Sequence, residues 1–172
     1  MYEIVVLSGK GGTGKTSIAA SLAVLAQKDA IIADCDVDAS NMYLLLKPDF
    51  GKTIDFYSGE LAVINQNLCI RCSKCAEICR FNAIIFIHNQ YQINALDCEG
   101  CCYCAKICPV NAITMHEQKS GYMYISKTKV GSKMVHAKLN IGAENSGKLV
   151  AKVKNEAKSL AVEENKSFII VD

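Results

Sequence analysis

Short apolar runs separated by polar or glycine-rich segments define most of this chain. Residues 4–7 and 30–33 are fully apolar, a pattern typical of strands buried on both faces of a parallel sheet. Residues 168–172 repeat the pattern and end on an acid. Helices are predicted over 17–27, 40–46 and 148–164, and further strands over 84–87, 91–93, 122–127 and 133–139. This alternation of strands and helices favours an α/β fold.

The apolar positions of the helices predict what they bury. In the first helix we expect Ile18, Leu22, Leu25 and the alanines to pack on the sheet. The last helix has helically spaced apolar residues, namely Leu149, Val150, Val153, Ala157, Leu160 and Ala161. Residues 48–59 mix Pro, Asp, Gly and Ser and are interpreted as a boundary, and residues 142–147 as a turn.

Composition narrows the class of protein. Hydrophobic residues make up 51% of the 172 positions and charged residues 21%, so the chain can bury a core. Lysines outnumber acids ten to five over residues 119–172, but no aromatic residues are interleaved, which favours a solvated face over a nucleic-acid site. The N-terminus lacks the basic region of a signal peptide, and no apolar run reaches the roughly 20 residues of a membrane span. We therefore expect a cytoplasmic protein with no membrane span and no nucleic-acid partner.

Eight of the ten cysteines form two runs with the same spacing. Each cysteine of the second run lies 29 positions after its counterpart, and the tripeptide Asn-Ala-Ile at 82–84 recurs at 111–113. Such an internal repeat indicates two copies of one structural unit. The first run is Cys69, Cys72, Cys75 and Cys79, and the second is Cys98, Cys101, Cys104 and Cys108.

The spacing resembles that of two-cluster bacterial ferredoxins over residues 61–116. In that pattern three close cysteines hold one [4Fe–4S] cluster and the fourth ligates the other. The resemblance implies one cluster on Cys69, Cys72, Cys75 and Cys108, and a second on Cys98, Cys101, Cys104 and Cys79. Structural zinc and a disulfide framework fit the spacing and the expected compartment less well.

Arg80 departs from the ferredoxin pattern, and two further cysteines, Cys35 and Cys102, are not part of it. Pro109 follows the last cysteine, whereas Arg80 stands at the corresponding place in the first run. Cys102, inside the second run, is a further possible ligand, although packing is the expected role of both Cys102 and Cys35.

Residues 9–16 have the sequence Gly-Lys-Gly-Gly-Thr-Gly-Lys-Thr between a predicted strand and a predicted helix. This is the phosphate-binding loop pattern, in which backbone amides and a helix N-terminus bind phosphates. Lys15 is expected to reach the β- and γ-phosphates of ATP, and Thr16 to ligate Mg²⁺. The residues predicted to bind the nucleotide are Gly9, Lys10, Gly11, Gly12, Thr13, Gly14, Lys15, Thr16 and Ser17.

A second lysine, Lys10, is the mark of the MinD/ParA family of deviant Walker A ATPases, which the chain resembles. The resemblance implies a homodimer in which Lys10 acts on the partner's phosphates. It implies that Asp36 orients the attacking water, with Asp34 or Asp38 in support, although these acids are also placed to cap the next helix. Asp172 ends a buried strand as a Walker B aspartate does and is predicted to bind Mg²⁺.

The two resemblances together imply a partial doubly wound P-loop ATPase sheet carrying an inserted α+β ferredoxin-like domain. The expected division is 1–60, ATPase; 61–116, insert; and 117–172, ATPase continued. The ATPase part is short for a complete domain, so we expect an N-terminal fragment that hydrolyses ATP poorly.

Three functions are carried forward, in order of preference. The first is nucleotide-gated electron transfer through two [4Fe–4S] clusters to an unknown redox partner protein. The second is an Mrp-type carrier or scaffold for iron–sulfur clusters, which would require a labile cluster. The third is a non-redox positioning ATPase of the MinD or ParA kind with structural clusters.

Overall fold

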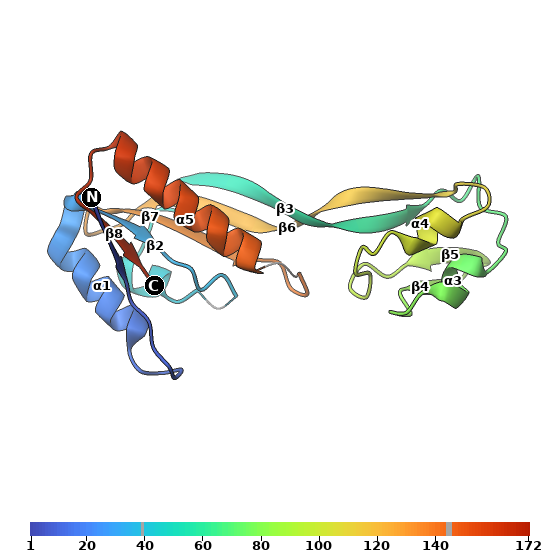
Figure 1. The fold of residues 1–172 in the computed structure, drawn as a ribbon, viewed down its shortest axis with the longest axis horizontal. Helices are drawn as coiled ribbons and strands as arrows, with labels where there is room; N and C mark the ends of the chain where they lie inside the picture. Colours follow the sequence, from blue (N-terminus) through green and yellow to red (C-terminus); the bar gives the residue numbers. More distant parts are fainter. Residues whose placement is uncertain (39, 144–145) are drawn as a thin grey trace. The chain divides into compact units, whose positions relative to one another are not determined.

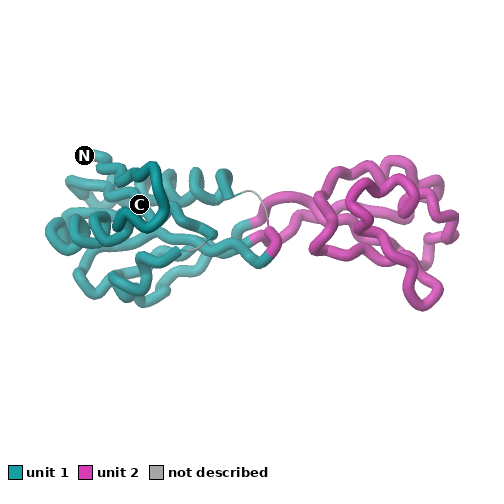
Figure 2. The backbone as a smooth tube through the Cα atoms, turned by 90° about the horizontal axis from the view of Figure 1, so that it is seen from below, with its two compact units in different colours: residues 1–56, 121–141, 145–172 teal, residues 57–120, 142–144 magenta. Residues whose placement is uncertain are grey.

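The computed structural model describes residues 1–38, 40–143 and 146–172, and these residues form two compact units (Figure 2). Of the described residues, the first unit contains 1–56, 121–141 and 146–172, and the second contains 57–120 and 142–143. The predicted insert, 61–116, lies within the second unit.

A six-stranded sheet runs in the order β1-β8-β2-β7-β6-β3 (Figure 1). The pairs β1–β8, β8–β2 and β2–β7 are parallel, and β7–β6 is antiparallel. The fold is therefore mixed α/β with a mostly parallel sheet. The strands are β1 (Tyr2–Val5), β2 (Ala30–Ala33), β3 (Lys52–Ile64), β6 (Ile113–Lys127), β7 (Lys133–Leu139) and β8 (Phe168–Val171).

Helices connect the parallel strands in two directions along the sheet. Helix α1 (Lys15–Ala26) leads from β1 to β2, and α5 (Ser146–Glu163) leads back from β7 to β8. Connections between parallel strands of one sheet are right-handed. Because the connections through α1 and α5 run in opposite directions along the sheet, the two helices lie on opposite faces of it. A short 3₁₀ turn (Gln27–Asp29) follows α1. Helix α2 (Met42–Leu46) packs beside α1.

Small residues bring α1 close to the sheet. Its buried residues are Ala19, Ala20 and Ala23, which pack with Ile32 and Ile170. Ile18 is 55% exposed and Leu25 is 81% exposed, so the prediction that they pack on the sheet was wrong. On α5, by contrast, the predicted stripe is buried at Leu149, Val153, Ala157 and Ala161.

The second unit is built from the cysteine repeat. It contains α3 (Lys74–Ile78), the hairpin β4 (Ile84–Ile87) and β5 (Gln90–Ile93), and α4 (Tyr103–Ile107). In the 29-residue repeat α3 corresponds to α4, and the pair β4–β5 corresponds to the start of β6 and the end of β3. One half of the repeat thus forms a closed hairpin, while the strands of the other half continue along β3 and β6.

Several predicted boundaries hold and others do not. The strands at 30–33 and 133–139 are confirmed, and the first strand lies at 2–5 instead of 4–7. The first strand is not buried on both faces, because Tyr2 and Val5 are exposed. The boundary predicted at 48–59 contains the point, between residues 56 and 57, where the first unit gives way to the second, although strand β3, which was not predicted, begins at Lys52. Part of the turn predicted at 142–147 lies outside the described residues.

Candidate iron–sulfur and nucleotide sites

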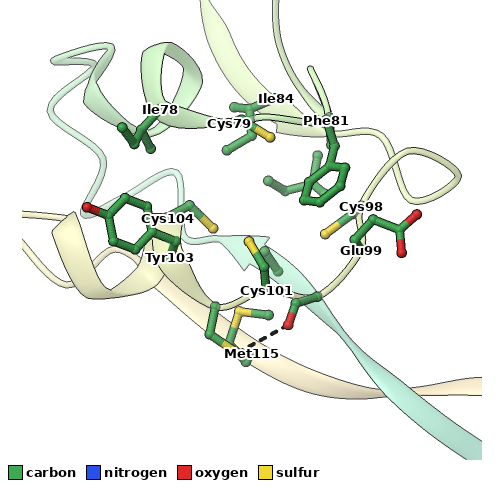
Figure 3. A pocket seen from close by; sticks show the side chains of 15 residues that line it. Ile78, Cys79, Phe81, Ile84, Cys98, Glu99, Cys101, Tyr103, Cys104 and Met115 are labelled. Carbon is green, nitrogen blue, oxygen red and sulfur yellow. Dashed lines mark hydrogen bonds between the residues drawn. The ribbon is translucent and has the colours of Figure 1, made fainter.

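Two cavities of the second unit are each lined by four of the repeated cysteines. We call them the first and second cluster sites. The first cluster site contains Cys69, Cys72, Cys75 and Cys108. The second contains Cys79, Cys98, Cys101 and Cys104. Figure 3 shows the four sulfur atoms of the second site turned toward one common space.

Each site combines three cysteines of one run with the last cysteine of the other, and backbone hydrogen bonds explain the exchange. The amide of Asn65 donates to the carbonyl of Ala112 over 2.7 Å. In the repeat this bond becomes Asn94 to Ala83, also 2.7 Å. The start of each copy is therefore hydrogen-bonded to the end of the other copy. This pairing places the fourth cysteine of each run beside the first three cysteines of the other run.

The linings fit iron–sulfur clusters. Apolar side chains such as Ile64 and Ile113 surround the first site, and Phe81 and Ile84 the second. The amide of Ala112 donates to the sulfur of Cys108 over 3.2 Å, and hydrogen bonds of this kind tune cluster potentials. Among the described residues, no three His, Cys, Asp or Glu side chains converge closely enough for a single metal ion. A cluster instead spreads its four thiolates over four irons.

The spare cysteine Cys102 occupies a capping position. Its φ of +64° matches that of Ser73, its counterpart 29 residues earlier, and each precedes a short helix. The Cys102 thiol donates to the Glu60 carboxylate over 2.9 Å, a contact that also raises its pKa. Although Cys102 also lines the second site, its backbone position is that of the serine in the other copy.

The loop at 9–16 joins β1 to α1, as its sequence predicted. Gly12 and Gly14 have φ of +75° and +86°, values that favour glycine. The loop lines an open cavity of about 510 Å³, a size within the range of small-molecule sites. Of the predicted residues the cavity contains Gly11, Gly12, Thr13, Gly14, Lys15, Thr16, Ser17 and Asp36. Gly9 and Lys10 are exposed and are not among its lining residues.

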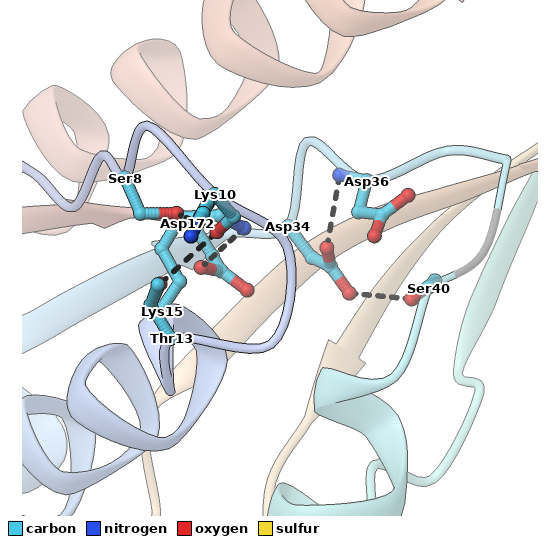
Figure 4. Close-up of polar contacts among 8 residues, drawn as sticks. All are labelled: Ser8, Lys10, Thr13, Lys15, Asp34, Asp36, Ser40 and Asp172. Atoms are coloured by element: carbon cyan, nitrogen blue, oxygen red, sulfur yellow. Dashed lines mark hydrogen bonds and ion pairs between the residues drawn. The ribbon is translucent and has the colours of Figure 1, made fainter.

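Parallel register brings two acids to the same end of the sheet. Val171 is paired with Val5 and with Ala33, so Asp172 and Asp34 follow the ends of adjacent strands. The Asp172 side chain is 1% exposed, and neither carboxylate oxygen accepts a hydrogen bond from a described residue. Lys15 Nζ lies 3.7 Å from Asp172 Oδ1 (Figure 4). A buried carboxylate that lacks hydrogen bonds fits a cation site.

The three acids of the 34–38 segment occupy different environments. Asp34 is buried and accepts hydrogen bonds from the Asp36 amide, over 3.1 Å, and from the Ser40 hydroxyl (Figure 4). Burial raises the pKa of Asp34 to about 6. Asp36 lines the cavity of the 9–16 loop, whereas Asp38 lines a separate aromatic pocket with His136. Asp34 thus holds the backbone of Asp36, and Asp38 lies apart from both.

Sequence reasoning missed several lining residues. Asn41 lines the cavity of the 9–16 loop, and Arg71, Lys74 and Glu99 line the cluster sites. The 29-residue offset could have drawn attention to Arg71, because it aligns Arg71 with Gly100 and so shows that the two copies differ at this position.

Comparison with known proteins agrees with the cysteine geometry. Residues 62–115 match the family described as a 4Fe-4S dicluster domain. The chain is therefore an iron–sulfur dicluster protein, and the family and the cysteine pattern together imply two [4Fe–4S] clusters.

The chain is also similar over 95% of its length to the uncharacterized protein MJ0578 of Methanocaldococcus jannaschii, with 42% identity over 165 residues. It spans 57% of the length of that relative. None of the helices in the described part of the chain has the length and apolar character needed to cross a membrane.

Proposed function

We propose that this chain belongs to a MinD/ParA-type ATPase that transfers electrons through two [4Fe–4S] clusters under the control of bound nucleotide. The observation that carries the redox part is the grouping of the eight cysteines into two four-sulfur sites within one unit. A self-contained set of eight ligands favours permanent clusters over a cluster in transit to another protein.

Bound [4Fe–4S] clusters would supply one-electron transfer at low potential. Cys69, Cys72, Cys75 and Cys108 would hold one, and Cys98, Cys101, Cys104 and Cys79 the other. Burial raises the pKa of the Cys104 thiol to about 11 and also raises that of Cys75. Because clusters bind thiolates, assembly at these cysteines would release protons. Cys72 and Cys101 are exposed and would bring each site nearest to a docked redox partner.

In the nucleotide site, the proposal gives each residue one role. The amides of the loop from Gly9 to Ser17 and the ammonium of Lys15 bind the phosphates of ATP. Thr16 and Asp172 bind Mg²⁺, which would supply the cation that the buried Asp172 carboxylate lacks. Asp36 orients the attacking water, with its backbone held by Asp34.

Lys10 acts between two copies of the chain. Its exposure, away from the cavity of its own loop, supports a role in a nucleotide-bridged homodimer, where it would reach the partner's phosphates. Association of two nucleotide sites would then be the step that controls docking of the redox partner.

Electron delivery to an acceptor tests this proposal. The anaerobically purified protein is reduced and mixed in a stopped-flow instrument with an oxidised low-potential dye or ferredoxin, with and without MgATP. We expect the rate of cluster reoxidation to change with MgATP in the wild type but not in Lys15→Ala. Loss of the protein's own absorbance with transfer of iron to an apo-protein would instead support a cluster carrier. Identical rates with and without MgATP would refute nucleotide control.

A further inference from the structure

The two cluster sites have nearly the same backbone. Residues Arg71 and Gly100, which correspond in the repeat, have φ of +58° and +62°. The amides of Asn82 and Asn111 donate to the carbonyls of Cys79 and Cys108 over 3.3 and 3.2 Å, respectively. Because the main chain repeats so closely, differences in how the sites treat a cluster come largely from their side chains.

The charges that line the two sites differ in sign. Arg71 and Lys74 line the first site, and among the described residues these are its only charged lining residues apart from the cysteines. In the described part of the chain, the charged residue that lines the second site, apart from its cysteines, is Glu99, and its carboxylate points outward beside Cys98 (Figure 3). Glu60 adds a second carboxylate there through its contact with the Cys102 thiol.

Arg71 occupies a backbone conformation that favours glycine, and the other copy has glycine at that place. At Gly100 a side chain is excluded, because a Cβ would lie 2.3 Å from the carbonyl oxygen of Glu60. The first site therefore keeps a cationic side chain in a strained conformation, next to Cys72. Residues held in such conformations cluster at functional sites.

We propose that Arg71 and Lys74 make the first cluster site the one that is reduced first, so that the two sites form a relay with a fixed direction. Reduction adds one electron, supplied by an external one-electron donor, and so adds one negative charge to a site. Nearby cations stabilise that added charge and nearby carboxylates oppose it. An electron entering at the second site would thus pass to the first. This inference rests on the proposed electron transfer and adds a direction to it.

Other charged residues near the runs leave the difference in lining charge in place. Glu77 accepts a hydrogen bond from the Ser73 hydroxyl in the first copy, as Glu60 does from the Cys102 thiol in the second, but Glu77 lines neither site. Arg80 follows Cys79 and is exposed, but it does not line the second site. Lys106 of α4 is also exposed and lines neither site. Arg80 is therefore the matched control, since it is a cation next to a cluster cysteine that lies outside the cavity.

Redox titration of the anaerobic protein with EPR detection tests the direction. We expect two one-electron steps in the wild type. Arg71→Gln should lower the reduced-to-oxidised ratio of the higher-potential step by roughly threefold to tenfold at fixed potential, where tenfold corresponds to about 59 mV. Arg71→Lys should restore the wild-type value, and Arg80→Gln should leave that step unchanged.

Two results would overturn the direction while leaving electron transfer intact. One is a pair of clusters that titrate together at a single potential. The other is an equal shift for Arg71→Gln and Arg80→Gln. If the protein assembles no clusters, or its clusters cannot be reduced, the proposed function falls together with the relay.

Discussion

Lys15 Nζ lies 3.7 Å from Oδ1 of Asp172, and this ion pair joins the first residue of α1 to the residue that follows β8. The lysine is one-third exposed, whereas the carboxylate is almost fully buried and accepts no hydrogen bond from the described residues. In the proposed nucleotide complex, Lys15 would instead contact the phosphates and Asp172 would contact Mg²⁺.

Replacing Asp172 by Asn tests that relationship. Removing the charge should weaken MgATP binding by roughly tenfold to hundredfold, because one charge-assisted contact is lost. Binding of ATP without Mg²⁺ should change little, and the free energy of unfolding should not fall, since a buried charge is removed. Isothermal titration calorimetry with and without Mg²⁺ measures the difference. Asp29→Asn, at an exposed position before β2, is the control; equal Mg²⁺ dependence in both variants would contradict the assignment.

The exchange of the fourth cysteine between the two runs predicts which pairs of cysteines act together. Cys69→Ala combined with Cys108→Ala removes two ligands of one site, so the double variant should retain about four iron atoms per chain. Cys69→Ala combined with Cys79→Ala damages both sites and should leave much less iron. Iron and sulfide analysis after anaerobic purification gives the count. The reverse order of iron contents would show that each run holds its own cluster.

Cys102 should be dispensable for cluster binding. Cys102→Ser reproduces the residue at the corresponding place in the other copy, Ser73, and should keep full iron content and the wild-type EPR spectrum. Cys104→Ser, two residues away, should lose or alter one cluster. If Cys102→Ser loses iron to the same extent as Cys104→Ser, Cys102 is a ligand.

His136 predicts a pH dependence of stability. Burial lowers its pKa to about 4, whereas an exposed histidine titrates near 6.5. Between these values the unfolded chain binds the extra proton, so this residue's contribution to stability falls as pH drops from about 6.5 toward 4, by up to roughly 3 kcal/mol.

Asp34 contributes with the opposite sign over part of that range. Burial raises its pKa to about 6, so the folded state binds the extra proton and stability is lost as pH rises from about 4 to 6. The contribution of His136 is therefore read as the difference between the wild type and His136→Gln in urea unfolding at several pH values. The stability advantage of the wild type over the variant should shrink as pH falls. A difference that stays constant between pH 6.5 and 4 would contradict the prediction.

The cluster sites were predictable because their information is local. The cysteine spacing and the 29-residue offset stand in the sequence, and the glycine-rich residues 9–14 lie between β1 and α1, at the strand–helix junction that their pattern predicts. The hydrogen bond from Asn65 to Ala112 joins residues 47 positions apart and has no local signal. The opposite charges at the two sites were visible in the sequence but acquire meaning only when the lining residues are known.

Strand β3 was missed because its sequence does not resemble a buried strand. Asp55, Ser58 and Gly59 weaken its strand propensity, and β3 lies at the edge of the sheet, where one neighbouring strand is sufficient. Its stability comes from pairing with β6, a property of the tertiary structure. In α1 the same limitation applies, because helical spacing predicts an apolar face but not that the fully buried contacts are made by Ala19, Ala20 and Ala23, with Leu22 only partly buried against them.

Quantitative EPR tests whether one chain holds two [4Fe–4S] clusters that respond to nucleotide. The anaerobic protein is fully reduced, and the spectrum is integrated before and after addition of MgATP. We expect about two unpaired spins per chain and a spectrum that MgATP alters in the wild type but not in Lys15→Ala. One spin or none per chain, or a two-spin spectrum that MgATP leaves unchanged, would contradict it.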